Sequence, residues 1–282
     1  MILKASILGI IEGLTEFLPV SSTGHLIIFS NLMDFYKHAD KTFVDLFNMI
    51  IQLGAILAVV FYYKKKIIHT IIHLLPSAKV PLSESGLYFW SMVIISCIPA
   101  ALIGLPFDNL VQEYLFNPPV VACTLFFGAL WMLYTEARLK GNMLTPLSDT
   151  NLTPGKALIV GLFQVLSIIP GMSRSASTII GGWATGMSTV AAAEYSFFLA
   201  IPVMFGQALI HFVKLLKMPT PLLNTQWLAL GVGFIVAFFV ALLVIDAFLG
   251  FLKKQPLRYF AFYRIFFAFI VLIAGLFGLL TI

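Results

Sequence analysis

The amino-acid sequence predicts an all-α protein that crosses a membrane several times. Of its 282 residues, 60% are hydrophobic and only 10% are charged, and the mean hydropathy is +1.01. Soluble domains carry roughly 25% charged residues, so this composition excludes both a soluble globular fold and a disordered chain. The net charge of +5 comes from Lys and Arg spread thinly between apolar stretches. That spacing is typical of membrane-protein loops and predicts no nucleic-acid partner.

Six stretches are long and apolar enough to form spanning helices, each of which needs roughly 20 residues. Because backbone polar groups inside a bilayer must find partners within the protein, we expect all six to be helical. They cover residues 43–63, 87–107, 119–136, 191–213, 227–250 and 259–281.

Two further apolar regions are interrupted by polar residues. Residues 3–33 break around Pro19, and residues 156–187 break around Pro170 and Gly171. Each region predicts two helices of about 12 to 15 residues, too short to span singly, that dip into the membrane and return as a re-entrant pair. Backbone that breaks at membrane depth is tolerated only against protein or a water-filled cavity, so both breaks are candidate sites.

The two broken regions resemble each other and predict an internal repeat. The chain then divides into a first repeat at 1–140, a linker at 141–154 and a second repeat at 155–282. Each repeat holds one re-entrant pair and three spans, and because three is odd, the second repeat is inverted relative to the first. The matching residues lie 152 positions apart, or 151 after a one-residue gap: Gly9, Glu12 and Thr15 with Gly161, Gln164 and Ser167, then Pro19 and Ser22 with Pro170 and Ser173.

The distribution of Lys and Arg predicts the orientation. Ten cations fall on one side of the six spans and five on the other. Because cytoplasmic loops are enriched in Lys and Arg, we expect the ten-cation side in the cytoplasm and both termini outside. The first re-entrant pair then enters from the outer face and the second from the inner face. Arg174 and Arg264 belong to neither side, because both are expected at membrane depth. Arg264 is expected to pair with Glu194 or to extend toward the interface.

Glu12 and Glu16 need a specific explanation, since a charge near the bilayer centre costs at least about 2.5–3.5 kcal/mol. Their i, i+4 spacing places both carboxylates on one helical face. Such a pair favours either protonation of one carboxyl group or a bound divalent cation. Mg²⁺ or Ca²⁺, with a substrate phosphate completing its coordination, fits two carboxylates. The alternative is that both side chains face water at the outer interface.

The run from Ser21 to His25 is typical of a helix N-terminus, with hydroxyl groups, including those of Ser22 and Thr23, at the capping positions. Free N–H groups and the positive end of the helix dipole favour an anion there. His25 lies in the first turns and could act as a base or a nucleophile. The alternative is a histidine with a purely structural hydrogen bond.

The run 170–178 has the same character, with Ser173 placed to cap the following helix and Arg174 supplying a permanent charge. Arg suits phosphate because its planar group donates two parallel hydrogen bonds. The structural alternative is an ion pair of Arg174 with Glu12 or Glu16 that holds the two halves together. A cation, a phosphate-binding Arg, hydroxyl groups and a His predict a phosphate-ester or diphosphate site reached from the lipid.

Two segments resemble the signature sequences of bacterial undecaprenyl-diphosphate phosphatases, the bacitracin-resistance family. The first is EGLTEFLPVSSTGH at residues 12–25, and the second is PGMSRS at residues 170–175. Residues 51–60 and 194–202 are also similar to the family. The resemblance runs over nearly the whole chain.

The resemblance implies a multi-pass enzyme of the bacterial plasma membrane that hydrolyses undecaprenyl diphosphate to undecaprenyl phosphate and inorganic phosphate. This reaction recycles the lipid carrier for peptidoglycan synthesis and confers bacitracin resistance. It implies an inverted repeat with two re-entrant pairs and a site open to the extracytoplasmic side. The implied partners are a polyprenyl diphosphate substrate and membrane lipid. The oligomeric state does not follow from the sequence, and a homodimer stays open.

Carried over by position, the resemblance also assigns residue roles. Three mechanisms stay open: attack by His25 through a phosphohistidine, attack by Ser22 with His25 as base, or attack by water activated by a metal and His25. The assigned residues are the metal ligands Glu12 and Glu16, the phosphate-binding residues Arg174, Ser173, Ser175, Ser22 and Thr23, and the catalytic residues His25, Ser22, Glu16 and Arg174.

Transport is the competing function, since inverted repeats with broken helices at the midplane are transporter architecture. Such a protein would move a polyprenyl phosphate or an inorganic ion across the bilayer. Paired carboxylates beside a His and a phosphate-binding Arg favour bond cleavage over permeation, so the sequence predicts the hydrolase.

Overall fold

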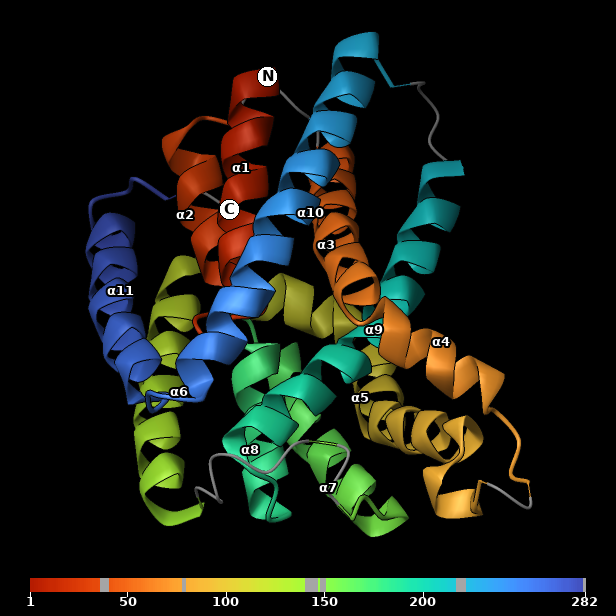
Figure 1. Ribbon diagram of the computed structural model, residues 1–282. Coiled ribbons are helices and arrows are strands. Elements are labelled where there is room, and N and C mark those ends of the chain that lie inside the picture. Colours follow the sequence, from red (N-terminus) through yellow and green to blue (C-terminus); the bar gives the residue numbers. More distant parts are fainter. Residues whose placement is uncertain (36–40, 78–79, 140–146, 148–150, 217–221, 281–282) are drawn as a thin grey trace.

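The computed structural model of the chain describes residues 1–35, 41–77, 80–139, 147, 151–216 and 222–280, and within these ranges the regular elements are all helical (Figure 1). The predicted linker at 141–154 lies largely outside the described residues. The α-helices are α1 (Ile2–Thr15), α2 (Ser22–Leu32), α3 (Lys41–Tyr62), α4 (Lys64–Ile72), α5 (Gly86–Tyr114), α6 (Pro118–Leu139), α7 (Pro154–Val165), α8 (Arg174–Ala184), α9 (Thr189–Leu216), α10 (Asn224–Leu252) and α11 (Arg258–Leu276), with short 3₁₀ turns η2 (Leu82–Glu84) and η4 (Leu166–Ile168).

Six of these helices are long and apolar enough to cross a membrane: α3, α5, α6, α9, α10 and α11. They coincide with the six stretches expected from hydropathy, so the prediction of an all-α membrane protein with six spanning helices is confirmed. Many of their large apolar side chains are exposed, as a lipid-facing surface requires.

The remaining apolar helices form two short pairs. Helices α1 and α2 have 14 and 11 residues, and α7 and α8 have 12 and 11. Each is shorter than the roughly 20 residues that a bilayer requires. The breaks fall where the sequence places them, while the re-entrant course of the pairs and the inversion of the repeat stay predictions.

The second helix of each pair begins in the same way. Ser21 precedes α2 and Ser173 precedes α8, and both have φ 71°, a left-handed conformation that is uncommon for serine. Each side chain accepts a hydrogen bond from a backbone N–H three residues on, at Gly24 (3.5 Å) and Ala176 (3.3 Å). The two caps are 152 positions apart, the same separation as Glu12 and Gln164. The structure therefore pairs Ser173 with Ser21, whereas the expected alignment paired it with Ser22 after a one-residue gap.

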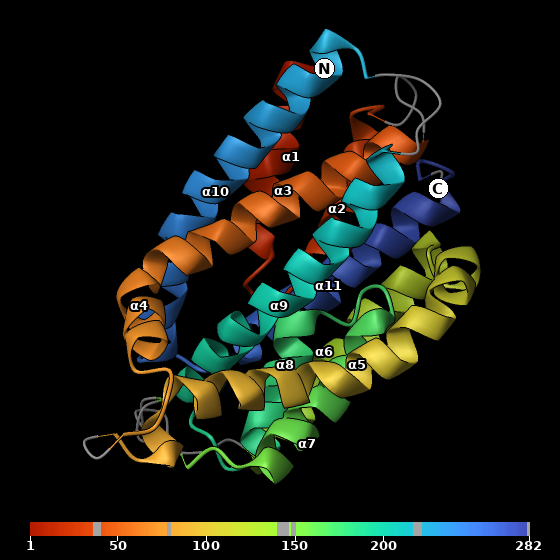
Figure 2. The same cartoon turned by 90° about the vertical axis from the view of Figure 1, so that its right-hand side faces the viewer.

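Each short pair packs against a long helix of the other half. Helix α1 lies beside α10, and α7 lies beside α5, as both views show (Figures 1 and 2). The contacts are close: a Cβ at Gly9 would lie 2.6 Å from the carbonyl oxygen of Gly233, and a Cβ at Gly161 would lie 2.5 Å from that of Ser96. Small residues permit this backbone approach in membranes. The cross-packing brings the two broken segments together in the interior.

Candidate functional site

Glu16 joins the two broken segments. One carboxylate oxygen, Oε1, accepts a hydrogen bond from Nη2 of Arg174 at 2.8 Å, and the other, Oε2, accepts one from Oγ of Ser22 at 2.6 Å. Ser22 and Arg174 are each the first residue of their helices, α2 and α8. The structure therefore brings three predicted site residues into direct contact, and the ion pair weighed as a structural alternative does form, with Glu16.

The other predicted hydroxyl groups surround this contact. Ser175 donates a hydrogen bond to the carbonyl oxygen of Leu18 at 3.0 Å, so the start of α8 touches the loop before α2. The hydroxyl groups of Ser173 and Ser175 lie 3.0 Å apart. Thr23 is in the first turn of α2 and is partly exposed. Two helix N-termini, which favour anions, thus lie within one polar cluster.

Glu12 lies one helical turn before Glu16 and is completely buried. The alternative in which both carboxylates face outer water is therefore wrong for Glu12. Neither oxygen of Glu12 accepts a hydrogen bond from a donor among the described residues, although its carboxyl group lies within hydrogen-bond reach of that of Glu16 and near the charge of Arg174. Its counterpart in the second pair, Gln164, is also buried with its amide atoms unpartnered among the described residues.

The carboxylates are a limited donor set for a metal. Within the described ranges, no group of three or more His, Cys, Asp or Glu side chains could hold an ion. Mg²⁺, however, is commonly held by one or two carboxylates plus substrate phosphates, and Ca²⁺ also takes oxygen ligands. The two unpartnered oxygens of Glu12, beside Glu16, fit such a cation on chemical grounds.

His25 is buried, and its ring faces α11. Its Nδ1 lies 2.8 Å from the carbonyl oxygen of Ser21, and its Nε2 lies 2.7 Å from the hydroxyl oxygen of Tyr263. The ring of Phe267 stacks on the imidazole, with centroids 3.8 Å apart and planes at 6°. Both ring nitrogens therefore have partners other than Ser22. This arrangement disfavours the mechanism in which His25 takes the Ser22 proton.

Arg264 is completely buried, and its Nη2 donates to the carbonyl oxygen of Gly171 at 3.0 Å. The expectation that it pairs with Glu194 or extends to the interface is wrong, because Glu194 pairs with Lys66 at 3.3 Å. The guanidinium fits only because residue 128 is glycine, since a Cβ there would collide with it. The sequence marked Arg264 as a charged residue at membrane depth, but it did not indicate the partner, Gly171, which lies 93 positions earlier in the chain.

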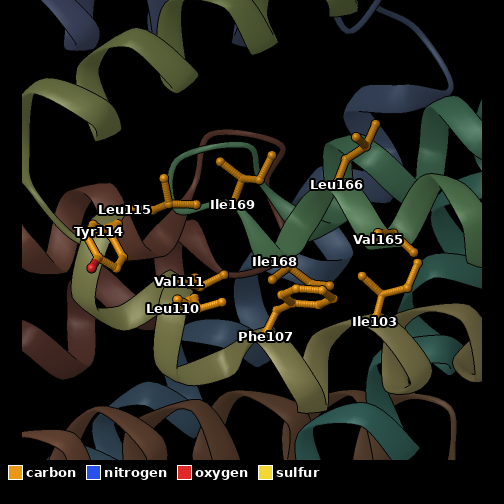
Figure 3. A pocket seen from close by; sticks show the side chains of 10 residues that line it. All are labelled: Ile103, Phe107, Leu110, Val111, Tyr114, Leu115, Val165, Leu166, Ile168 and Ile169. Carbon is orange, nitrogen blue, oxygen red and sulfur yellow. The ribbon is translucent and has the colours of Figure 1, made fainter.

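An apolar groove of about 430 Å³ borders the second broken segment (Figure 3). Its walls come from the C-terminal half of α5, from the last residue of α7, and from η4 with the residue after it, Ile169. The carbonyl oxygen of Ile169 accepts a hydrogen bond from the N–H of Met172 at 3.2 Å, in the turn that leads to Ser173. One wall of the groove, at Ile169, therefore adjoins the turn that precedes Ser173. Its lining residues are Ile103, Phe107, Leu110, Val111, Tyr114, Leu115, Val165, Leu166, Ile168 and Ile169.

Comparison with known proteins gives matches along the whole chain. Residues 5–270 match the family described as "Bacitracin resistance protein BacA". An undecaprenyl-diphosphatase of Ruminiclostridium cellulolyticum is 53% identical over 277 residues, which are 98% of this chain and 97% of that protein. Undecaprenyl-diphosphatases of Clostridium novyi and Clostridium tetani are 47% and 46% identical, over 99% and 100% of this chain and 98% and 99% of those proteins.

Proposed function

The chain belongs to the bacitracin resistance protein BacA family, and from this membership we propose how its residues carry out the reaction. It is a membrane phosphatase that hydrolyses undecaprenyl diphosphate to undecaprenyl phosphate and inorganic phosphate. The names of its relatives give no support to the competing transport function.

The observation that carries the mechanism is the 2.6 Å hydrogen bond from Ser22 to Glu16. Ser22 is the nucleophile, and Glu16 accepts its proton. The Ser22 oxygen forms a bond to the terminal phosphorus, and the bond from that phosphorus to the bridging oxygen breaks, so undecaprenyl phosphate leaves. Water then hydrolyses the phosphoserine and releases inorganic phosphate, and the proton on Glu16 returns to Ser22.

Arg174 binds the transferring phosphoryl group. Its Nη2 pairs with Glu16, whereas its Nη1 is buried and has no hydrogen-bond partner among the described residues. That nitrogen can bind a phosphate oxygen while the ion pair persists. The backbone N–H groups at the starts of α2 and α8, with Thr23, add further donors. Ser173 and Ser175 shape this pocket through their contacts in the loops.

Glu12 and Glu16 would hold a divalent cation, Mg²⁺ or Ca²⁺, together with substrate phosphate. When bound, the cation supplies positive charge that stabilises the phosphoryl oxygens. Its support is the completely buried carboxyl group of Glu12, which has no donor among the described residues and lies beside Glu16, so that it needs either a proton or a cation.

The polyprenyl chain of the substrate lies in the apolar groove between α5 and η4. The described residues that line the groove carry no charged side chain, and one of them, Ile169, lies in the loop that leads to Ser173 and Arg174. A diphosphate in the polar cluster can therefore place the start of its chain on an apolar wall.

The two halves are an inverted repeat, and the site opens to the extracytoplasmic side with both termini outside. The matched caps at Ser21 and Ser173 and the cross-packing of α1 and α7 support the repeat. The ten-to-five distribution of Lys and Arg supports the orientation. The start of α1 and the end of α11 both lie in the upper part of the two views (Figures 1 and 2). A homodimer stays a prediction.

The test is phosphate release from a polyprenyl diphosphate by purified protein in detergent, with Mg²⁺ or Ca²⁺ and with EDTA. Ser22→Ala and Glu16→Gln should each abolish release in the presence of metal. The matched control is Ser30→Ala on the same helix, because Ser30 is buried and its hydroxyl has no partner among the described residues. Substantial release by Ser22→Ala would exclude Ser22 as the nucleophile. No release by folded wild-type protein would contradict the hydrolase itself.

A further inference from the structure

Helix α11 contacts both broken segments through two consecutive residues. The hydroxyl group of Tyr263 lies 2.7 Å from Nε2 of His25, across 238 positions of sequence. The next residue, Arg264, donates to the carbonyl oxygen of Gly171. The last helix of the chain therefore holds the start of α2 and the loop before α8 at the same time.

The partners of His25 determine which ring nitrogen carries the proton. The carbonyl oxygen of Ser21 can only accept a hydrogen bond, so the proton lies on Nδ1. In the neutral ring Nε2 is then an acceptor, and the hydroxyl group of Tyr263 donates to it. Neither partner carries a charge, and the imidazole is 3% exposed, so burial favours the neutral form.

Aromatic packing fixes the plane of the same ring. Phe267 stacks on His25 with centroids 3.8 Å apart, and the ring of Tyr263 is nearly parallel to the imidazole, at 5°. The hydrogen bond to the Ser21 carbonyl then connects the imidazole to the residue that caps α2, directly before Ser22. A chain of contacts thus leads from Tyr263 through His25 to the first turn of α2.

We propose that Tyr263 is a positioning residue for the reaction: its hydroxyl group holds His25 in the Nδ1-protonated tautomer, and His25 in turn fixes the Ser21–Ser22 turn against Glu16. This inference rests on the proposed role of Ser22 as nucleophile. It assigns His25 to orienting that turn, because both of its nitrogens are engaged. Outer-shell partners that fix a histidine tautomer typically contribute about 10-fold to 100-fold where this has been measured at metal sites.

The hydroxyl group of Tyr263 can be removed with little effect on packing. Tyr263 is 43% exposed, and Tyr263→Phe keeps the ring that neighbours Phe267. Tyr259→Phe is a matched control, because Tyr259 lies one turn earlier on α11, is 51% exposed and contacts Phe251 through its ring. Both variants lose one hydroxyl group from the same helix.

The experiment combines kinetics with ¹⁵N NMR of protein labelled at histidine, in detergent. The chain has five histidines, and the His25 signals are identified by their absence from His25→Gln. Wild type should show the neutral Nδ1-protonated pattern for His25, and Tyr263→Phe should show mixed tautomers. Its kcat should fall about tenfold with KM nearly unchanged, while Tyr259→Phe should match wild type in both measurements.

Two results would overturn the proposal. One is an unchanged His25 tautomer in Tyr263→Phe, and the other is a changed tautomer with full kcat. Absence of phosphate release by wild type would instead contradict the proposed function. The NMR comparison would still report on the Tyr263–His25 contact in that case.

Discussion

The carboxylate of Glu16 lies 2.8 Å from the guanidinium group of Arg174, although 158 positions separate the two residues. Both side chains are largely buried, at 9% and 14% exposed. A buried ion pair contributes little net stability when intact, but removing one partner leaves an uncompensated charge. A shift between the two broken segments that separated Glu16 from Arg174 would therefore leave buried charges unpaired in the site.

Replacing Arg174 with Lys should lower kcat/KM by about 10-fold to 100-fold, because Lys keeps the charge but cannot bind Glu16 and phosphate through separate, fixed nitrogens. Arg174→Ala should lose activity altogether and also lower the melting temperature. Steady-state phosphate release and thermal unfolding would measure both effects.

A second ion pair, between Lys66 and Glu194, offers the control for that experiment. Lys66 and Glu194 lie 3.3 Å apart, with Lys66 33% exposed and outside the polar cluster. Lys66→Ala should therefore leave kcat/KM within about twofold of wild type, since partly exposed ion pairs contribute little. Equal losses in Lys66→Ala and Arg174→Lys would show that the Arg174 effect is one of general stability.

Glu12→Gln should separate metal binding from folding. Gln is similar in shape to Glu but neutral, so it relieves the burial of a carboxyl group that has no donor among the described residues and faces the charge of Glu16. Without metal the variant should be at least as stable as wild type, yet Mg²⁺ or Ca²⁺ should no longer raise its melting temperature or its rate. Full metal-dependent activity in Glu12→Gln would remove Glu12 from the metal site.

The elements that the sequence could predict depend on local signals. Six spans follow from runs of apolar residues, and the breaks follow from Pro and Gly beside hydroxyl groups. Glu12, Glu16 and Arg174 were recognisable because charge at membrane depth is costly wherever its partner lies. These features need no knowledge of which helices become neighbours.

The partners of the site residues depend on packing between distant helices, which one sequence does not report. Tyr263 looks like an interfacial aromatic residue until α11 is placed beside α2, where it meets His25. Arg264 stood out as a charge, but hydropathy carries no information on its contact with Gly171. The short helix α4 was missed because its three lysines resemble a simple end to the preceding span.

Arg264 should matter more for activity than for stability. Its Nε and Nη1 are buried without partners among the described residues, so replacing the charge relieves an unfavourable burial while losing the contact to Gly171. Arg264→Met should therefore unfold near the wild-type temperature and lose up to about 100-fold in kcat, the cost that a 1 Å misplacement of the loop can have. Gly128→Ala should have the same kinetic effect by displacing the guanidinium. A large loss of stability with normal kcat would contradict this assignment.

Filling the apolar groove should change the preference for substrate chain length. Val111→Trp adds bulk to a wall of the groove without touching the polar cluster. The variant should hydrolyse undecaprenyl diphosphate with a KM raised about tenfold, since burying one large apolar side chain is worth about 1.5–3 kcal/mol, but it should hydrolyse a water-soluble diphosphate with a short isoprenoid chain at the wild-type rate. Activity on the short substrate also reports that the variant is folded.

A tryptophan placed elsewhere on the lipid-facing surface distinguishes a chain-binding groove from a general effect of surface bulk. Leu243 lies on α10 and is 74% exposed, outside the groove, so Leu243→Trp should leave the kinetics of both substrates unchanged. Parallel losses for short and long substrates in Val111→Trp would mean that the helix has shifted the active site. An unchanged KM for the long substrate would mean that the polyprenyl chain lies outside this groove, because a side chain of that size leaves no room for both.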